Sequence, residues 1–275
     1  MEIRQARVLT ALDTLTCGDH VGWILKQPTQ FAEQAALCLQ QGAAAGQKLF
    51  YFGPGRGAGP QLLPIGDGVT VLDPYVTFLH GGGLDATAMY AGFRREAARA
   101  DAEGYRGLRI VADMDWLQGP HPSGGQIAAF EQGLDAVVAE TGATIVCAYR
   151  RESFPHRDLA GVMCVHPHVL GTAPKDLGFR VWSSGEGRWH LAGQVDLRVA
   201  EEFGAVIRTA AEGRTSLWLD CSRLRFIDVA GIRALARAAR STGVSMRLHG
   251  ASETLQRSWK LLEWDSVVPN VEFSV

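Results

Sequence analysis

Continuous apolar segments alternate with helical segments along residues 18–170, and this alternation limits the fold more than any other feature of the sequence. Strands that are apolar throughout need cover on both faces of their sheet, and strands joined by helices run parallel. The pattern therefore predicts an α/β domain with a mainly parallel sheet sandwiched by helices. The predicted strands are 20–25, 48–52, 108–112, 144–149 and 161–165, and the predicted helices are 28–41, 85–103 and 123–140.

The pattern changes after residues 171–178, a short connector that contains two glycines and a proline. Two alternating segments joined by Gly-Glu-Gly-Arg then predict a β-hairpin. This change divides the chain into two expected domains, residues 1–172 and a smaller α/β domain at 179–275. The second domain is expected to contain strands 179–184, 189–195, 216–221, 244–248 and 271–275 and helices 197–211, 229–241 and 252–262.

Composition and charge exclude several functions. The net charge is -2 and the Lys and Arg residues are scattered, so nucleic acid is not an expected partner. Residues 1–7 lack the apolar stretch of a signal peptide, and no run approaches the roughly 18 apolar residues of a membrane span. The five cysteines, an odd number without a Cys-x-x-Cys pair, indicate reduced thiols. A cytoplasmic protein without a membrane partner is therefore expected.

The most specific motif of the chain lies at 217–235, where a strand ends in Phe-Ile-Asp228 and a helix opens with Val-Ala-Gly231-Ile. Upstream, Leu191-Ala-Gly-Gln-Val-Asp-Leu197 precedes the first helix of the same domain. Together these segments resemble the STAS family of anti-sigma-factor antagonists, stressosome proteins and sulfate transporters. The resemblance covers about residues 179–275. It implies a domain that binds an anti-sigma factor, a switch kinase or another STAS protein.

The loop at Asp228 keeps the geometry of a STAS switch and lacks its chemistry. Asp228 stands where an N-cap is expected, with its carboxylate accepting hydrogen bonds from the amides of the next turn. In the family the phosphorylated residue immediately follows this Asp, whereas here Val229 and Ala230 follow. The resemblance therefore implies a partner-docking loop formed by Asp228, Val229, Ala230 and Gly231 that cannot be phosphorylated. An ordinary capped helix explains the same residues equally well.

The first turn between strand and helix in the N-terminal half lacks a phosphate-binding loop. In RecA-type ATPases the first strand leads into Gly-x-x-x-x-Gly-Lys-Ser/Thr, whose amides cradle phosphates. Here residues 26–30 are Lys-Gln-Pro-Thr-Gln. The glycine-rich segment 53–59 follows the second predicted strand and contains no lysine. The layout therefore resembles a degenerate RecA-like unit, and no ATP turnover is expected.

Four short motifs are spread over residues 10–172. They are Asp19-His-Val-Gly-Trp23, Gly104-Tyr-Arg-Gly-Leu-Arg-Ile-Val-Ala-Asp-Met-Asp-Trp116, Val146-Cys-Ala-Tyr149 and His166-Pro-His-Val-Leu170. Together they resemble the MEDS domain, a proposed sensory module of methanogens and methylotrophs. The resemblance implies binding of a small hydrocarbon-like or other apolar ligand. No cofactor is expected. The family usually has a Cys or an aromatic residue in place of Gly22.

Polar and aromatic side chains lie near the predicted strand ends of this domain. In an open parallel sheet, ligands bind in the crevice beyond the carboxyl ends of the strands. Asp113 and Trp116 fit this rule best, whereas His20 opens its strand and is equally explained as a core histidine. A mostly apolar pocket is expected near several of these strand ends. The candidate ligand-binding residues are His20, Trp23, Tyr51, Asp113, Trp116, Cys147, Tyr149 and His166.

Two further patterns carry less weight. Cys164, His166 and His168 alternate along one predicted face, as ligands of zinc or copper could. Pro167 interrupts that run and a fourth ligand is not evident nearby, so no metal is predicted, and whether this face binds one stays open. The segment 80–83, His-Gly-Gly-Gly, imitates the oxyanion-hole loop of some esterases, but a Gly-x-Ser-x-Gly motif is missing.

These observations predict a cytoplasmic signalling protein without enzymatic activity. In it, a small-molecule-sensing domain is coupled to an anti-anti-sigma-like interaction domain that lacks the phosphorylatable serine. The alternative is a nucleotide-dependent or hydrolytic enzyme on a degenerate RecA-like fold. A third interpretation is a structural adaptor whose pocket is filled by its own Trp and Tyr side chains. The sequence leaves open the ligand, the protein partner and the oligomeric state, a homodimer included.

Overall fold

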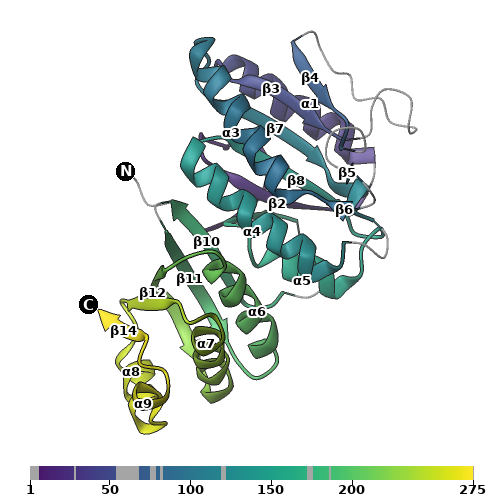
Figure 1. Cartoon of the computed structure of the whole chain (residues 1–275). Coiled ribbons are helices and arrows are strands. Elements are labelled where there is room, and N and C mark those ends of the chain that lie inside the picture. Colours follow the sequence, from purple (N-terminus) through teal and green to yellow (C-terminus); the bar gives the residue numbers. More distant parts are fainter. Residues whose placement is uncertain are drawn as a thin grey trace. The chain divides into compact units, whose positions relative to one another are not determined.

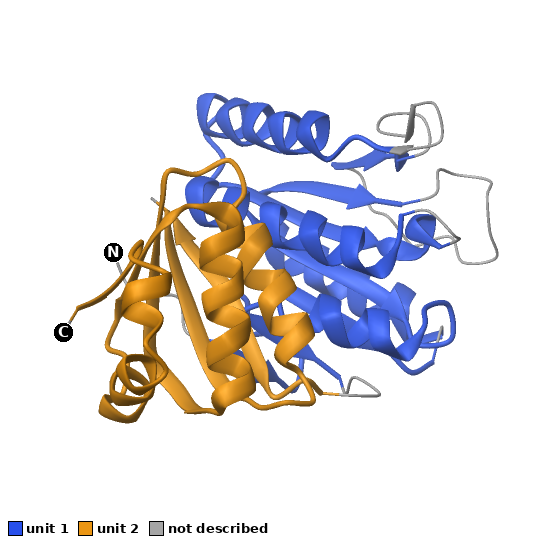
Figure 2. Cartoon of the chain, turned by 60° about the horizontal axis from the view of Figure 1, so that its bottom comes forward, with its two compact units in different colours: residues 1–175 blue, residues 176–275 orange. Residues whose placement is uncertain are grey.

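The computed structural model describes residues 6–27, 29–53, 68–74, 79–80, 83–118, 122–171, 176–185 and 187–274. The chain forms two compact units, Met1–Lys175 and Asp176–Val275 (Figure 2). Parts of the glycine-rich segment 53–59, of the segment 80–83 and of the connector 171–178 lie outside the described residues. The helices in the described part of the chain lack the length and hydropathy that a membrane crossing requires.

The first unit is built on a seven-stranded sheet in which every neighbouring pair is parallel (Figure 1). Its central strands are buried along their whole length, because helices cover both faces. In spatial order the strands are β1 (Arg7–Leu9), β9 (His168–Leu170), β2 (His20–Leu25), β8 (Thr144–Arg150), β7 (Leu108–Asp113), β3 (Lys48–Phe52) and β4 (Val69–Leu72). A separate antiparallel pair joins β5 (Leu79–His80) to β6 (Gly83–Leu84).

Alternate residues of each strand face two different hydrophobic cores. On one face, α1 (Thr29–Ala44) packs with residues such as Val21, Trp23 and Val146. On the other face, helices α3 (Ala86–Ala102), α4 (Gly124–Thr141) and α5 (His156–Met163) pack with residues such as Ile24 and Ile145. A short 3-10 helix, η1 (Met114–Leu117), follows β7. The predicted α/β class, with a parallel sheet between helices, is confirmed.

One predicted strand of this unit is wrong. Residues 161–165 belong to the end of α5 and the turn after it, and the strand that follows is β9. Leu159, Ala160, Val162 and Met163 are the buried residues of α5, and this spacing is that of a helix packed on a core. A short apolar run satisfies both periods, so its sequence alone does not separate strand from helix.

The second unit is a smaller α/β fold on a five-stranded sheet (Figure 1). Its strands, in spatial order, are β10 (Phe179–Gly185), β11 (Arg188–Val195), β12 (Ser216–Ile227), β13 (Ser245–His249) and β14 (Val271–Ser274). The first pair is the predicted antiparallel hairpin and the remaining pairs are parallel. The helices are α6 (Ala200–Ala211), α7 (Val229–Thr242), α8 (Glu253–Leu261) and α9 (Trp264–Val267).

Candidate functional site

Four fully buried side chains meet between the sheet of the first unit and its helix α4. We call them the buried cluster: His20, Glu131, Cys147 and His166. His20 opens β2, and Cys147 lies in the neighbouring β8 on the same face of the sheet. Glu131 comes from α4, and His166 from the turn that follows α5. The cluster thus joins two strands, one helix and one turn that are far apart in the sequence.

One carboxylate oxygen, Glu131 Oε2, is the point at which the other three groups converge. It lies 3.3 Å from His20 Nε2, 3.4 Å from His166 Nε2 and 3.4 Å from Cys147 Sγ. Cys147 Sγ also lies 3.6 Å from His20 Nε2. The two imidazole rings are neighbours, with centroids 4.2 Å apart. Two imidazoles and a thiol therefore face a single oxygen in the interior of the domain.

Groups around the buried cluster hold three of its four side chains in place. Asp135 Oδ1 lies 3.2 Å from His20 Nδ1, and the carbonyl of Val162 lies 2.9 Å from His166 Nδ1. The Tyr149 hydroxyl donates a hydrogen bond to the second oxygen of Glu131. These contacts leave Nε2 of both imidazoles and Oε2 of Glu131 directed at the centre.

Gly22 makes room for one of the imidazoles. A Cβ at this position would lie 2.8 Å from Met163 and 3.0 Å from the ring of His166. A larger residue would therefore have to displace the His166 ring or the Met163 side chain from its present place. Gly22, where the family that this domain resembles usually has a Cys or an aromatic residue, thus lies next to the buried cluster.

The surroundings shift the pKa values of these groups in opposite directions. Burial raises the pKa of Glu131, but the neighbouring His166 and His20 outweigh it and leave the value far below the usual range. Burial lowers the pKa of His20, and Asp135 and Glu131 reverse that effect and raise it. Burial and the Glu131 charge both raise the pKa of the Cys147 thiol and of the Tyr149 phenol.

Sequence reasoning identified His20, Cys147, Tyr149 and His166 as candidates and missed the two carboxylates. Glu131 and Asp135 are four residues apart on α4, so they lie on the same face of the helix. That face also carries Ile127, Leu134 and Val138, all buried. The sequence feature that could have identified them is the presence of two acidic residues on an otherwise apolar helix face. Acidic side chains are rarely buried unless they are paired, so such a face indicates buried partners.

A second charged group, which we call the carboxyl-end cluster, lies where β3, β7 and β8 end. It consists of Tyr51, Asp113, Asp115 and Arg150. The Arg150 guanidinium donates two hydrogen bonds to Asp113, of 2.8 and 2.9 Å, and also pairs with Asp115. The central carbon of this guanidinium, Arg150 Cζ, lies 5.4 Å from the centre of the Phe31 ring. Sequence reasoning identified Tyr51 and Asp113 but neither Arg150 nor Asp115.

Charge pairing also shifts the pKa values of the carboxyl-end cluster. Burial, together with the Asp113 charge, raises the pKa of Asp115 although Arg150 opposes the shift. Burial works against the Arg150 cation, but Asp113 and Asp115 outweigh it and raise its pKa. Burial chiefly, and then the Asp113 charge, raises the pKa of Tyr51. The Arg150 cation therefore pairs with both carboxylates, although burial still favours the protonated form of Asp115.

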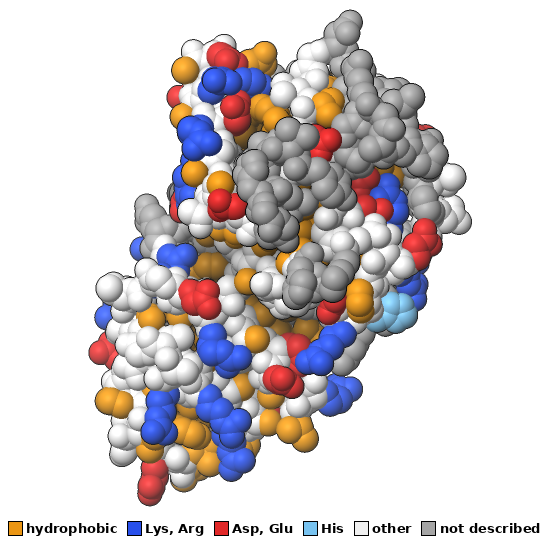
Figure 3. All heavy atoms as spheres, turned by 45° about the vertical axis from the view of Figure 1, so that its right-hand side comes forward, with side chains coloured by type: hydrophobic (Ala, Val, Ile, Leu, Met, Phe, Trp, Pro, Cys, Tyr) orange, Lys and Arg blue, Asp and Glu red, His pale blue; other side chains and the backbone are white. Residues whose placement is uncertain are grey.

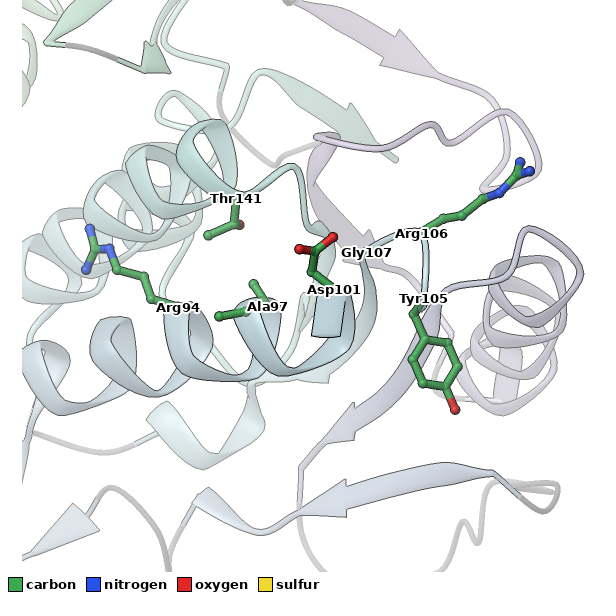
Figure 4. A pocket seen from close by; sticks show the side chains of 8 residues that line it. Arg94, Ala97, Asp101, Tyr105, Arg106, Gly107 and Thr141 are labelled. Atoms are coloured by element: carbon green, nitrogen blue, oxygen red, sulfur yellow. The ribbon is translucent and has the colours of Figure 1, made fainter. Parts of the chain in front are cut away.

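The sheet separates seven of the eight predicted ligand-binding residues into two groups, and the eighth, Asp113, lies in the carboxyl-end cluster. His20, Cys147, Tyr149 and His166 gather around Glu131, and Trp116 packs edge-on to Phe52 on the same side. Trp23 and Tyr51 pack around Phe31 on the opposite side. A hollow of about 450 Å³ lies at the amino ends of the strands (Figure 4), between α3, the end of α4 and residues 105–107. None of the eight predicted residues lines it, so the expected apolar pocket stays a prediction.

The run Cys164, His166 and His168 does not converge on one point. His168 Nε2 lies 3.0 Å from Asp19 Oδ1, and the Cys164 thiol donates to the carbonyl of Gly161 at 3.0 Å. Only His166 joins the buried cluster. The helical end of α5 is the reason, since it replaces the extended strand in which the three side chains would have shared one face.

In the second unit, Asp228 connects the start of α7 to the turn before α6. Its Oδ1 accepts from the Gly231 amide and its Oδ2 from the Leu197 amide, each at 2.9 Å. A Cβ at Gly231 would lie 2.7 Å from Ile227, so glycine is required for this close approach. Three apolar side chains around this cap are exposed, Leu197 at 75%, Phe226 at 51% and Val229 at 47%. We call these three residues the docking patch.

Comparison with known proteins gives a family match for each of the two units. Residues 19–167 match the MEDS family, described as the methanogen/methylotroph, DcmR sensory domain, and residues 180–269 match the Mlab, STAS domain family. Among solved structures, the chain is similar to the anti-sigma factor antagonist SpoIIAA in its unphosphorylated form. That match has 20% identity over 30% of this chain and 82% of that chain, with a TM-score of 0.26. No curated protein matches. The chain therefore belongs to the MEDS family, and a STAS domain follows its MEDS domain.

Proposed function

We propose that this is a cytoplasmic signalling protein in which the MEDS domain binds a small apolar molecule and the STAS domain binds a partner protein. The combination of a sensory domain with an anti-sigma-antagonist-like domain supports a signalling role. The proposed partner is an anti-sigma factor, a switch kinase or another STAS protein. Sensory and STAS domains are typically not catalytic, and we propose no enzymatic activity.

The observation that carries this proposal is the docking patch. Exposed side chains of Leu197, Phe226 and Val229 surround a helix start that Asp228 holds by two hydrogen bonds. Large apolar side chains grouped at a rigid loop lose water-exposed area when a partner covers them. The match to an interaction family points to a protein as that partner.

The charge beside the docking patch favours a partner with an acidic surface. Arg233, Arg237 and Arg240 are exposed at helical spacing along α7, and Arg225 is exposed on β12. Figure 3 shows Lys and Arg side chains beside hydrophobic ones on the part of the surface formed by the second unit. Complementary charge of this kind raises the rate of encounter and selects partners.

Control of such a partner has to work without phosphorylation at this loop. Val229 and Ala230 have no hydroxyl, so the charge of about -1.5 to -2 that a phosphate adds cannot appear there. We propose that the MEDS domain supplies the signal instead. Its proposed ligand site is the crevice at the carboxyl ends of the strands, near Tyr51, Asp113 and Trp116.

A matched pair of variants tests the docking patch. Val229 and Val267 are the same residue type with the same 47% exposure, and Val267 lies on α9. Calorimetry would measure binding of the full chain to purified anti-sigma factors, switch kinases and other STAS proteins of the same organism. We expect Val229→Asp to weaken binding at least about tenfold, or about 1.4 kcal/mol. Val267→Asp should leave it unchanged.

Two results would reject the proposal. One is equal loss of binding in both variants, and the other is the absence of binding by every such partner. For the ligand, native mass spectrometry of the chain taken directly from cells should detect a small molecule that dissociates on denaturation. A chain that carries no such mass under any growth condition would contradict the sensory role.

A further inference from the structure

We propose that the buried cluster binds one divalent transition-metal ion, with zinc as the best fit. The ligands are His20 Nε2, Glu131 Oε2, Cys147 Sγ and His166 Nε2. Together they offer one sulfur, one oxygen and two nitrogens whose atoms all lie within 4.8 Å of one another. This inference goes beyond the proposed function, because neither the docking patch nor a ligand at the carboxyl ends of the strands depends on it.

The distances between the donor atoms fit a tetrahedral site. In such a site with bonds of about 2.0–2.3 Å, neighbouring donors lie roughly 3.3–3.6 Å apart. The oxygen of Glu131 lies 3.3, 3.4 and 3.4 Å from the other three donors, and Cys147 Sγ lies 3.6 Å from His20 Nε2. Four of the six edges of a tetrahedron therefore already have the length that a bound ion requires.

A second layer of groups orients the donors as in known metal sites. A metal-bound histidine usually donates its other ring N–H to a carboxylate or a carbonyl. Here Asp135 faces Nδ1 of His20, and the Val162 carbonyl faces Nδ1 of His166. Each contact places the proton on Nδ1 and leaves the lone pair of Nε2 directed at the centre. Tyr149 similarly holds Glu131 Oε1, so that Oε2 faces inward.

One donor, the Nε2 atom of His166, lacks a hydrogen bond of ordinary geometry. His166 Nε2 is completely buried and has no hydrogen-bond partner among the described residues, although it lies 3.4 Å from Glu131 Oε2. A buried polar atom without a partner costs free energy, and such atoms are rare in folded proteins. Coordination of a metal ion would satisfy this nitrogen.

Hydrogen bonding alone explains the buried cluster poorly. For both Nε2 atoms to donate to Glu131, both imidazoles would need a proton on each nitrogen. Two imidazolium rings with centroids 4.2 Å apart would then lie side by side in the interior, and the Glu131 and Asp135 carboxylates would have to offset their mutual repulsion while the Cys147 thiol stayed without a charged role. With a divalent ion, the imidazoles stay neutral, and the charges of the Glu131 carboxylate and a Cys147 thiolate cancel the charge of the ion.

The ligand set also selects the kind of ion. Magnesium and calcium take oxygen ligands, whereas a mixed sulfur, nitrogen and oxygen set in tetrahedral geometry is typical of zinc. Four protein ligands leave no position for a substrate, so the site is structural or regulatory. The ion would join β2 and β8 to α4 and to the turn after α5, and so attach the helical layer to the sheet.

Cobalt is a spectroscopic probe for this site. We expect the full chain, freed of metal by a chelator, to take up one Co²⁺ with tetrahedral absorption bands and a thiolate-to-metal band, and Zn²⁺ to displace it. Cys147→Ser should abolish the thiolate band. Cys38→Ser and Cys164→Ser should retain it, since Cys38 is equally buried on the other side of the sheet and Cys164 faces Gly161.

X-ray absorption of the zinc-loaded wild-type chain gives a test that needs no variant. We expect one sulfur at about 2.3 Å and three nitrogen or oxygen neighbours at about 2.0–2.1 Å. A wild-type chain that binds neither Co²⁺ nor Zn²⁺ would overturn the proposal. So would a zinc spectrum without sulfur, or a thiolate band that survives Cys147→Ser and disappears in Cys164→Ser.

Discussion

The two charged clusters of the MEDS domain are built from similar groups and differ in how their charge is balanced. In the carboxyl-end cluster, Asp113 and Asp115 share the Arg150 guanidinium, and the side chain of Arg150 is 16% exposed. In the buried cluster, two imidazoles, a thiol and a phenol face Glu131, and a second carboxyl, that of Asp135, faces His20. The carboxyl-end cluster thus contains a permanent cation, Arg150. In the buried cluster, the lone pairs of nitrogen, oxygen and sulfur atoms are directed at one point.

This difference teaches how a structural ion pair can be distinguished from a binding site. Arginine stays protonated in proteins, so it closes a carboxylate pair without any further partner. Histidine and cysteine are neutral or charged according to their surroundings, and they bind metals through lone pairs. A converging set of such donors, most of them oriented by a second layer of groups, therefore indicates a cation-binding site more strongly than the number of charges does.

The largest expected effect is that of Glu131→Ala. The change removes the carboxylate that faces both imidazoles and leaves them without their anionic partner in the interior. Removal of one partner of a buried charged pair typically costs about 3–5 kcal/mol. Urea denaturation should detect this loss in the first unit. Glu140→Gln on the same helix is the control, because its partly exposed pair with Arg94 should contribute at most about 1 kcal/mol.

If Glu131→Ala and Glu140→Gln have equal effects on stability, the distinction between the two kinds of cluster fails. The chain with a bound metal should show the larger difference between these variants. A bound ligand stabilises the folded state in proportion to the logarithm of its concentration over its dissociation constant.

The next effect is that of Asp135→Asn, which alters the group behind His20 and leaves all four proposed ligands in place. Loss of such a supporting carboxylate typically weakens metal affinity 10–100-fold, or about 1.4–2.7 kcal/mol. Competition with a chromophoric chelator measures this affinity. The fold should persist, since Asn has nearly the same shape. An unchanged zinc affinity in Asp135→Asn would show that Asp135 does not orient His20 for a metal.

Arg150→Met breaks the carboxyl-end cluster and should have a smaller effect on stability. The change leaves Asp113 and Asp115 side by side without their cation, at a position that water partly reaches. We expect a loss of about 1–2 kcal/mol, as for a polar group deprived of its partner. Arg151→Met, at the exposed neighbouring position, should stay within about 0.5 kcal/mol. Equal unfolding midpoints for the two variants would contradict the role assigned to Arg150.

The sequence predicted the sheet of the first unit better than the groups that meet on it. Strands 20–25 and 48–52 agree with β2 and β3, because long apolar runs between helices leave few alternatives. β1 and β4 were not predicted, since they are short strands at the two edges of the sheet. The prediction of a strand at 161–165 was wrong because the apolar residues of this segment suit a helix as well as a strand.

The buried cluster shows why site residues were harder to predict than strands. His20, Cys147 and His166 were candidates, but a metal was not predicted, because spacing in a sequence relates only ligands that are close along the chain. Glu131 is 111 residues after His20 and reaches it only through the packing of α4 on the sheet. His166 was grouped with Cys164 and His168 in a strand that does not exist. The residues of the buried cluster come together through long-range packing, and the spacing of residues along the sequence does not reveal such contacts.

The smallest predicted effect is the pH response of Asp115, which sharpens the comparison because only the carboxyl-end cluster takes part. Burial and Asp113 raise the pKa of Asp115 above the model-peptide value of 3.8, although Arg150 and Gln118 oppose the shift. A carboxyl whose pKa is higher in the folded chain binds its proton more tightly there. It therefore stabilises the fold below the unfolded pKa, and this contribution is lost as the pH rises through the folded pKa.

Asp115→Asn should remove that dependence. Above the folded pKa the variant should be as stable as the parent chain or slightly more so, and as the pH rises from 3.8 through the folded pKa of Asp115 its stability should change less with pH. Urea denaturation at several pH values measures both quantities, with Asp101→Asn on the exposed side of α3 as the control. A parent chain whose stability instead rises more steeply than that of Asp115→Asn across this range would mean that Arg150 outweighs burial. The pKa of Asp115 would then be lowered, and the carboxyl-end cluster would be held together by attraction to both of its carboxylates.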